Sequence, residues 1–553
     1  GRTERFIDPK SSNATARTAN SSTSTNSSLL GDLYTTSSDN TKWDTQFSLY
    51  YSRSLGLHNL NVSAIVNAQS TKSESTSAHY RGFPSGAFHS PNYAAEIYQK
   101  PSKSESLKRL VGFLLSANYT WNDIYLADLS VRFDGSSEFG SDQKWAPFWS
   151  AGVGLNVHNY SFLKDNDMIN QVKVRVSYGQ TGKVNFPSYS AKTVYETNDR
   201  WYATGFGTQL KALGNHNLKW ETTNKLNMGT DLQFWNERIS LNFDYYYNKT
   251  VDLITDVSLP ASAGFTSYKD NLGETLNKGF DIQVRFDVYR DKDWNVSLWG
   301  NLNHNRNEIL KISDALRAYN ERVNEKYEAA EDAQGNVNLS AYGSEYSEPE
   351  MKYEEGASLT SIFAIRSLGI DPMTGNELFL YRDGSVSSLW KATETVRVGD
   401  EEPKASGSFG VNLTYKNLTL FASFAYDWGK QTYNQTLVDG VENADIENSN
   451  VDRRVLTQRW QKPGDIAPLR NIKDMNTSTM PTSRFVQDDN ELSLSALTLS
   501  YDFNTDWLKK IRLKMLRLEL STNDLFRAST VRQERGTSYP FARTFNFSLR
   551  ATF

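Results

Sequence analysis

The residues that could carry catalytic or metal-binding chemistry are few and widely scattered along this 553-residue chain. Cysteine is absent, which excludes disulfides, thiolate metal ligands and cysteine nucleophiles. The six histidines show no HExxH or comparable ligand spacing: His58, His79, His89, His158, His216 and His304. The sequence also has no GxxxxGK[ST] loop, no GxSxG nucleophile elbow and no GxGxxG that follows a strand and opens a helix. We therefore expect a protein that is not an enzyme and that uses no cofactor or metal.

Aromatic side chains offer a different chemistry, because their faces stack on sugar rings and on peptide side chains. They make up 13% of the chain, and many fall outside the regular patterns described below. Six of them form the candidate substrate-binding set: Tyr80, Phe88, Trp201, Tyr202, Tyr342 and Tyr346. For any one of them the alternative is that it packs loops together or belongs to an aromatic girdle. As a set they predict a site above or inside the mouth of the fold.

The elements that must position these residues read as β-strands, because apolar and polar residues alternate almost throughout. In RISLNFDYYYNKT (238–250) one face would carry five apolar residues: Ile239, Leu241, Phe243, Tyr245 and Tyr247. The stretches at 125–135, 171–179, 280–290 and 543–553 alternate in the same way. These runs reach roughly ten residues, the length of a tilted membrane strand, whereas ordinary strands have about five or six. The polar face carries full charges at strand centres, which suits a water-filled lumen.

The overall composition indicates which class of β protein this is. The mean hydropathy is -0.60 although Tyr, Phe and Trp are abundant, a combination typical of membrane β-barrels in which every second residue meets lipid. No apolar run of about 18 residues occurs, so we expect no transmembrane helix. The net charge of -4 gives no basic field for nucleic acid. We predict an all-β fold, a transmembrane antiparallel β-barrel in the outer membrane.

The connections between strands are predicted to alternate in length. Short ones are expected at five places: 54–57, 121–123, 235–237, 290–293 and 416–418. Long ones are expected at five others: 70–106, 180–217, 251–276, 308–406 and 431–485. Outer-membrane barrels have short periplasmic turns and long extracellular loops. The C-terminus is therefore expected in the periplasm.

This pattern gives about 15 strands, from one near Trp43–Arg53 to the one that ends at Phe553. Whether Ser361–Tyr381 adds a further pair of strands is left open by the sequence. Because the first of these strands runs downward, at least one upward strand must precede residue 43. The Ser/Thr/Asn-rich stretch 1–42 is predicted to be an extracellular loop region, and 43–553 the C-terminal part of the barrel.

One clear helical pattern lies within the longest loop, at Ser313–Ala333. Ser313 is a candidate N-cap, and an apolar stripe follows at helical spacing: Leu316, Tyr319, Val323 and Tyr327. The helix either touches a partner or ligand, or packs on its own loop. The second interpretation is favoured.

Several stretches spread over the chain point to a particular protein family, which overall composition cannot do. They include FDGSSEFGSDQKWAPFWSAGVGLNV (133–157), FLKDNDMINQVKVRVSYGQTGK (162–183), NLKWETTNKLNMGTD (217–231), RWQKPGD (459–465) and SRFVQDDNELSLSALTLSYDF (483–503). In this order they resemble the SusC/RagA family of TonB-dependent outer-membrane transporters. The terminal YPFARTFNFSLRATF completes the resemblance.

The resemblance implies a 22-stranded barrel with a plug domain, of which these residues would supply about strands 8 to 22. It implies active import of an oligosaccharide or oligopeptide, with a SusD-like surface lipoprotein as a lid and the TonB complex as the energy source. A plug-bearing N-terminal half would be a further partner, in a separate chain or outside these residues, and the barrel surface would meet membrane lipids or lipopolysaccharide. A passive porin or structural barrel is the alternative function, and a soluble carbohydrate-binding β protein is a third.

Overall fold

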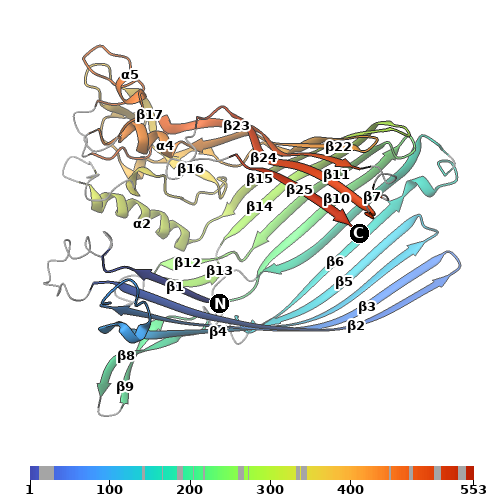
Figure 1. The fold of residues 1–553 in the computed structure, drawn as a ribbon, viewed down its shortest axis with the longest axis horizontal. Helices are drawn as coiled ribbons and strands as arrows, with labels where there is room; N and C mark the ends of the chain where they lie inside the picture. Colours follow the sequence, from blue (N-terminus) through green and yellow to red (C-terminus); the bar gives the residue numbers. More distant parts are fainter. Residues whose placement is uncertain are drawn as a thin grey trace.

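The fold is a large antiparallel sheet that carries a cluster of loops at one end (Figure 1). It is seen in a computed structural model, which describes residues 1–10, 30–139, 143–164, 166–183, 191–202, 205–215, 218–258, 267–271, 273–331, 337, 345–446, 450–471, 477–503, 508, 512–532 and 543–553. Among the described helices, none is both long and apolar enough to cross a membrane.

Within the described residues, the main sheet contains sixteen strands that follow one another in chain order and pair antiparallel with their neighbours. They are β1 (Arg2–Ile7), β2 (Asp32–Leu55), β3 (His58–Arg81), β4 (Glu96–Trp121), β5 (Tyr125–Ser136), β6 (Trp145–Asn156), β7 (Ile169–Lys183), β10 (Glu221–Phe234), β11 (Ile239–Val251), β14 (Glu274–Arg290), β15 (Trp294–Lys311), β21 (Ala405–Tyr415), β22 (Leu418–Tyr433), β23 (Val486–Asp502), β24 (Met515–Ser529) and β25 (Phe545–Thr552). The sheet curves into a trough, with β2 to β4 on one side and β22 to β25 on the other (Figure 1).

The register confirms that alternation separates two chemically different faces. Phe243 of β11 lies opposite Ile282 of β14, and such pairs continue along one face. On the other face Arg175 contacts Asp231 at 2.7 Å and also pairs with Asp244. Large apolar side chains remain exposed on the sheet, with Phe547 at 69%. A β-barrel in lipid places such residues against acyl chains and the charges toward the lumen.

The expected strand count is confirmed from β2 onward, because fifteen strands run from there to β25. The expectation of a loop region over 1–42 is wrong at both ends of that stretch. Arg2–Ile7 forms β1 and pairs with Asp32–Ser37, so β2 begins eleven residues before the expected boundary at 43. β1 supplies the upward strand that the sequence required. Residues 11–29 lie outside the described residues.

The expected loop at 70–106 is also much shorter in the structure. β3 continues to Arg81 and β4 already begins at Glu96, so both strands extend far beyond a membrane-spanning length. Their upper halves are polar on both faces, which removes the alternation that marks a strand in sequence. Cross-strand ion pairs accompany the pairing: Lys72 contacts Glu105 and Lys103 contacts Glu74, each at 3.3 Å.

The remaining connections follow the predicted pattern closely. The short turns are formed by residues with left-handed backbone, such as Asn122, Asn236 and Lys416. The alternation of short and long connections is less strict between β6 and β7. Their connection, 157–168, is longer than the other turns and includes the short 3-10 helix η3 (Val157–Asn159). Two long loops carry hairpins of their own: β8 (Val194–Tyr202) with β9 (Gly205–Ala212), and β12 (Ile254–Ser258) with β13 (Ser267–Asn271).

The two longest loops, 312–404 and 434–485, pack together as one unit that we call the loop head. It contains α2 (Asp314–Ala330), η5 (Glu345–Ser347), β16 (Ser361–Ala364), β17 (Arg366–Ile370), β18 (Glu377–Leu380), β19 (Val386–Ser387), η6 (Ala392–Glu394), β20 (Val396–Asp400), α4 (Gln435–Leu437), η7 (Val438–Glu442), α5 (Arg454–Thr457) and η8 (Ser483–Phe485). The strands expected within Ser361–Tyr381 therefore exist, but they form small sheets (β16 with β20, and β17 with β18 and β19) apart from the main sheet.

Candidate functional site

The loop head has its own hydrophobic core, which gives the segments near the mouth a defined shape. The core joins residues from both long loops: Val323, Tyr327, Val337, Tyr346, Ile365, Phe379, Trp390, Ala392 and Met480. The indole Nε1 of Trp390 donates to Pro481 O at 3.0 Å, and this hydrogen bond links the two loops. Burial of so many apolar groups far apart in sequence holds both loops in one arrangement.

The helix predicted in this region is present and packs on its own loop. Its N-cap is Ser313, whose side chain accepts a hydrogen bond from the Leu316 amide. Val323 and Tyr327 of the predicted stripe are buried in the core, and the Tyr327 hydroxyl donates to Glu348 O at 3.0 Å. The helix therefore positions the segment that follows η5, which lines the pocket described next.

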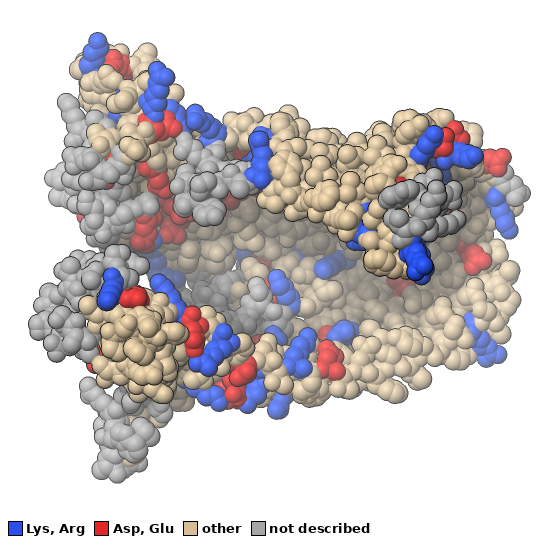
Figure 2. Space-filling view, in the orientation of Figure 1, with Lys and Arg blue, Asp and Glu red and all other residues tan. Residues whose placement is uncertain are grey.

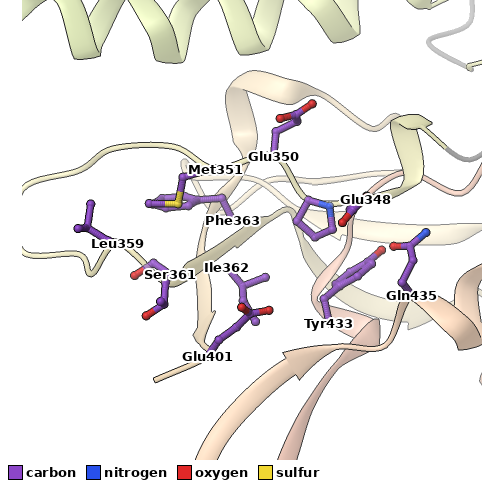
Figure 3. A pocket seen from close by; sticks show the side chains of 12 residues that line it. Glu348, Glu350, Met351, Leu359, Ser361, Ile362, Phe363, Glu401, Tyr433 and Gln435 are labelled. Carbon is purple, nitrogen blue, oxygen red and sulfur yellow. The ribbon is translucent and has the colours of Figure 1, made fainter. Parts of the chain in front are cut away.

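A pocket of about 300 Å³ lies where the loop head meets the top of β22 (Figure 3). Three sections of chain line it: the segment 348–351, the segment 359–363 with Glu401 beside it, and the end of β22 with the start of α4. Its apolar lining comes from Pro349, Met351, Leu359, Ile362 and Phe363, and its polar lining from Glu348, Glu350, Thr360, Ser361, Glu401, Tyr433 and Gln435.

The carboxylates of this pocket differ in how they are neutralised. Glu350 accepts from Lys326 Nζ at 2.7 Å. Glu348 and Glu401 are exposed, and neither side chain has a hydrogen bond or ion pair with the described residues. Although the Glu401 side chain reaches the surface, partial desolvation by its surroundings raises its pKa; the Lys430 ammonium opposes this, while Asp400 and Glu348 raise the pKa further. The site therefore holds excess negative charge.

The pocket lies at the upper end of β22, where the loop head packs on this strand. Lys430, which influences Glu401, pairs with Asp489 at 3.3 Å across β22 and β23. Further along the same face of these strands, Glu491 pairs with Arg527, whereas the opposite face carries apolar residues such as Leu492. Figure 2 shows Asp and Glu side chains gathered beside the loop head, at the entrance to the hollow of the sheet.

The six aromatic residues predicted to bind substrate do not form one site in the structure. Tyr80 lies near the end of β3 rather than in a loop, and Phe88 is exposed in the β3–β4 connection. Trp201 and Tyr202 lie in the β8–β9 hairpin, opposite Phe206 and Gly205.

The other two predicted residues belong to the loop head. Tyr346 is buried in its core, where its ring packs edge-on against Tyr327 at 5.5 Å. Tyr342 lies outside the described residues. A substrate role for any of the six stays a prediction.

Sequence reasoning missed the pocket because its residues come from three distant segments. The one local signal is the acidic run SEPEMKYEEG (347–356), which precedes β16. As for metals, the residues that the structure describes contain no group of three or more His, Asp or Glu that could hold an ion.

Comparisons with known proteins agree with this architecture. A profile of the family described as "TonB dependent receptor-like, beta-barrel" matches residues 4–361. TonB-dependent receptor P3 of Formosa agariphila is 28% identical over 487 residues, which cover 86% of this chain and 47% of that protein. TonB-dependent receptor SusC of Bacteroides thetaiotaomicron is 29% identical over 285 residues, covering 49% of this chain and 28% of SusC.

Among solved structures, the RagAB peptide transporter matches with a TM-score of 0.78 at 22% identity, over 96% of this chain and 55% of that one. The RagAB peptide importer in its "open-open" state matches with a TM-score of 0.79, also at 22% identity, over 96% of this chain and 54% of that one. The chain spans about half the length of the curated relatives P3, P39 and P26 that it matches. The resemblance to SusC/RagA proteins is confirmed, and the chain belongs to the family of TonB-dependent receptor-like β-barrels.

Proposed function

We propose that this chain is part of a TonB-dependent transporter that imports an oligosaccharide or oligopeptide across the outer membrane. The observation that carries the proposal is the family match over residues 4–361, together with a sheet that has one polar face and one apolar face. The polar face would line the path of the ligand, and the loop head would stand at its outer entrance. In this orientation the long loops are extracellular and the C-terminus is periplasmic.

The barrel is proposed to be completed by strands outside these residues. Among the described residues, β1 pairs with β2 only from Asp32 to Ser37 and Gly1 bonds to Ser38, so 39–55 of β2 has no neighbouring strand on that side, and β25 lies at the opposite edge of the sheet. Unpaired backbone groups are not tolerated in lipid, because no water is there to satisfy them. A plug-bearing N-terminal half would supply these strands, the plug and the contact with TonB. Mass spectrometry of the folded assembly should find that half; a functional assembly that lacks it would contradict this part.

A SusD-like lipoprotein is proposed as a lid on the loop head. Support comes from large apolar side chains that the loop head leaves exposed, among them Ile466 (94%), Leu456 (68%) and Met373 (67%). Such residues on an outer surface often mark a protein interface. Replacing Leu456 and Ile466 by Asp should abolish co-purification of the lipoprotein, whereas the control Lys462→Asp should retain it.

The import proposal is tested by uptake of labelled oligosaccharides and oligopeptides into cells with and without TonB. We expect uptake to depend on both TonB and this protein. Uptake that survives TonB deletion would instead establish a passive porin. Recovery of the assembled protein without detergent would exclude the membrane barrel.

A further inference from the structure

We propose that the pocket between the loop head and the top of β22 binds a cationic group of the substrate, a primary ammonium or a guanidinium, and so selects oligopeptides with a basic residue over neutral glycans. This inference rests on the proposed import function and specifies its substrate. It stands on the hydrogen-bonding state of the polar groups that line the pocket.

The donors of the pocket's polar side chains are largely engaged within the protein. The amide nitrogen of Gln435 donates to Ser347 Oγ at 2.8 Å and to Asp439 Oδ1 at 2.9 Å. Thr360 Oγ1 donates to Asp400 Oδ1 at 2.8 Å. The hydroxyl of Ser361 lies 3.1 Å from that of Ser358. A ligand that needs to accept several hydrogen bonds therefore finds few donors here.

The acceptors, in contrast, are left free. The carboxylates of Glu348 and Glu401 have no hydrogen bond or ion pair with the described residues. Among the described residues, the enclosed amide oxygen of Gln435 has no hydrogen-bond partner, and the enclosed Tyr433 hydroxyl, which can donate as well as accept, lies beside it. In Figure 3 the side chains of Glu348, Tyr433 and Gln435 come together at one end of the pocket. These groups form an acceptor-rich wall.

Ammonium and guanidinium groups only donate hydrogen bonds, whereas each sugar hydroxyl both donates and accepts. A wall of free acceptors with two charged carboxylates therefore matches a cation. It offers few hydrogen-bond donors to the oxygen atoms of sugar hydroxyls. Hydrogen bonds between charged partners are also stronger than neutral ones. The cation would relieve the repulsion between Glu401 and Glu348.

The apolar lining fits the rest of such a side chain. Ile362 and Phe363 are buried, and Met351 and Leu359 continue the same lining. Lysine and arginine carry apolar stems that pack along such surfaces while the charged end reaches polar partners. A volume of about 300 Å³ accommodates one side chain rather than a whole oligomer. The rest of the ligand would remain outside the pocket.

The test measures binding to the complete transporter, purified with its other half and its lid. The probes are a blocked pentaalanine with a central lysine, the same peptide with a central norleucine, and a neutral glucan pentamer. We expect the lysine peptide to bind roughly tenfold or more tightly than the norleucine peptide, because a charge-assisted contact is lost. The double change Glu348→Gln and Glu401→Gln should remove this preference.

The matched control removes two charges from the exposed side of α2, by Glu321→Gln and Glu325→Gln, and should keep the preference. Thermal unfolding should show that both double variants fold, since none of the four carboxylates is buried. Equal affinity for the two peptides, or a preference that persists in the Glu348/Glu401 variant, would overturn the inference. Because this assay reads binding without TonB, a failure of the import proposal would appear separately, as uptake that does not need TonB.

Discussion

At the scale of single residues, Arg484 is the main electrostatic link inside the loop head. Its guanidinium donates to Glu377 Oε2 at 2.8 Å and to Glu442 Oε1 at 2.6 Å, and it also lies over the Phe485 ring. Glu442 and Glu377 are both buried. One cation thus neutralises two carboxylates from the two long loops.

Replacing Arg484 by Ala should destabilise the loop head by about 3–5 kcal/mol, because the buried carboxylate of Glu377 loses its counter-charge and that of Glu442 keeps only the longer contact to Arg470 at 3.8 Å. Thermal unfolding and the rate of limited proteolysis within 434–485 would measure the loss. The control is Arg366→Ala, on an exposed side chain of β17, which should change little. Equal effects of the two changes would contradict the assigned role of Arg484.

Lys352 is a second residue of the loop head, and its burial should make the stability of the protein depend on pH. Its buried ammonium donates to Asn324 Oδ1 at 2.6 Å, Ala392 O at 2.8 Å and Thr395 Oγ1 at 2.5 Å. Burial lowers the pKa of Lys352 from 10.5 to about 8. Between these pH values the unfolded chain binds a proton that the folded chain does not, so stability rises with pH across the window and falls as the pH drops from 10.5 to 8.

Unfolding followed from pH 8 to pH 10.5 should therefore show a rise in the unfolding free energy that Lys352→Met lacks. The difference is on the order of 3 kcal/mol over the window, at about 1.4 kcal/mol per pKa unit. Lys391→Met, at an exposed position, should keep the rise. Parallel curves for the protein and its Lys352→Met variant would show that this amine does not titrate in the window.

At the scale of elements, α2 begins at the N-cap Ser313 and packs into the core of the loop head. Ser313→Ala should cost about 1 kcal/mol, because the Leu316 amide loses its acceptor at the helix start. Ser313→Asp should restore most of that loss. Faster proteolysis within 314–330 in the Ala variant alone would confirm the cap, and identical rates in all three proteins would argue against it.

Elements were predictable where the chemistry of a segment was local. Alternation located β10, β11, β14 and most other strands, because successive side chains of a strand point to opposite faces. It failed for the upper parts of β2, β3 and β4, where Ser, Thr, Lys and Glu occupy both faces and resemble a loop. Pairing with neighbouring strands decides the structure there, and pairing partners are not visible in a single segment.

At the scale of the whole molecule, the two faces of the sheet should respond oppositely to charge. Phe243→Arg places a cation on the apolar face, where an arginine in the bilayer costs about 2–4 kcal/mol near its centre. Asn242→Arg places the same cation on the polar face, opposite Asp231. Folding yield of the complete assembly in lipid bilayers should drop for the first variant only. A drop for Asn242→Arg alone would reverse the assignment of the faces.

The sequence alone determined the strand-rich class, the two faces, the number of strands from β2 onward and the family. These features follow from local periodicity and from motifs that lie within single segments. The pocket was decided only by the tertiary structure, because Glu348, Glu401 and Tyr433 meet through the packing of two loops and a strand end. The environment of Tyr346 was also decided by the tertiary structure. Its ring was a candidate contact for substrate, and it lies buried in the core of the loop head. Packing between distant segments selects which polar groups stay free, and no pattern within one segment records that choice.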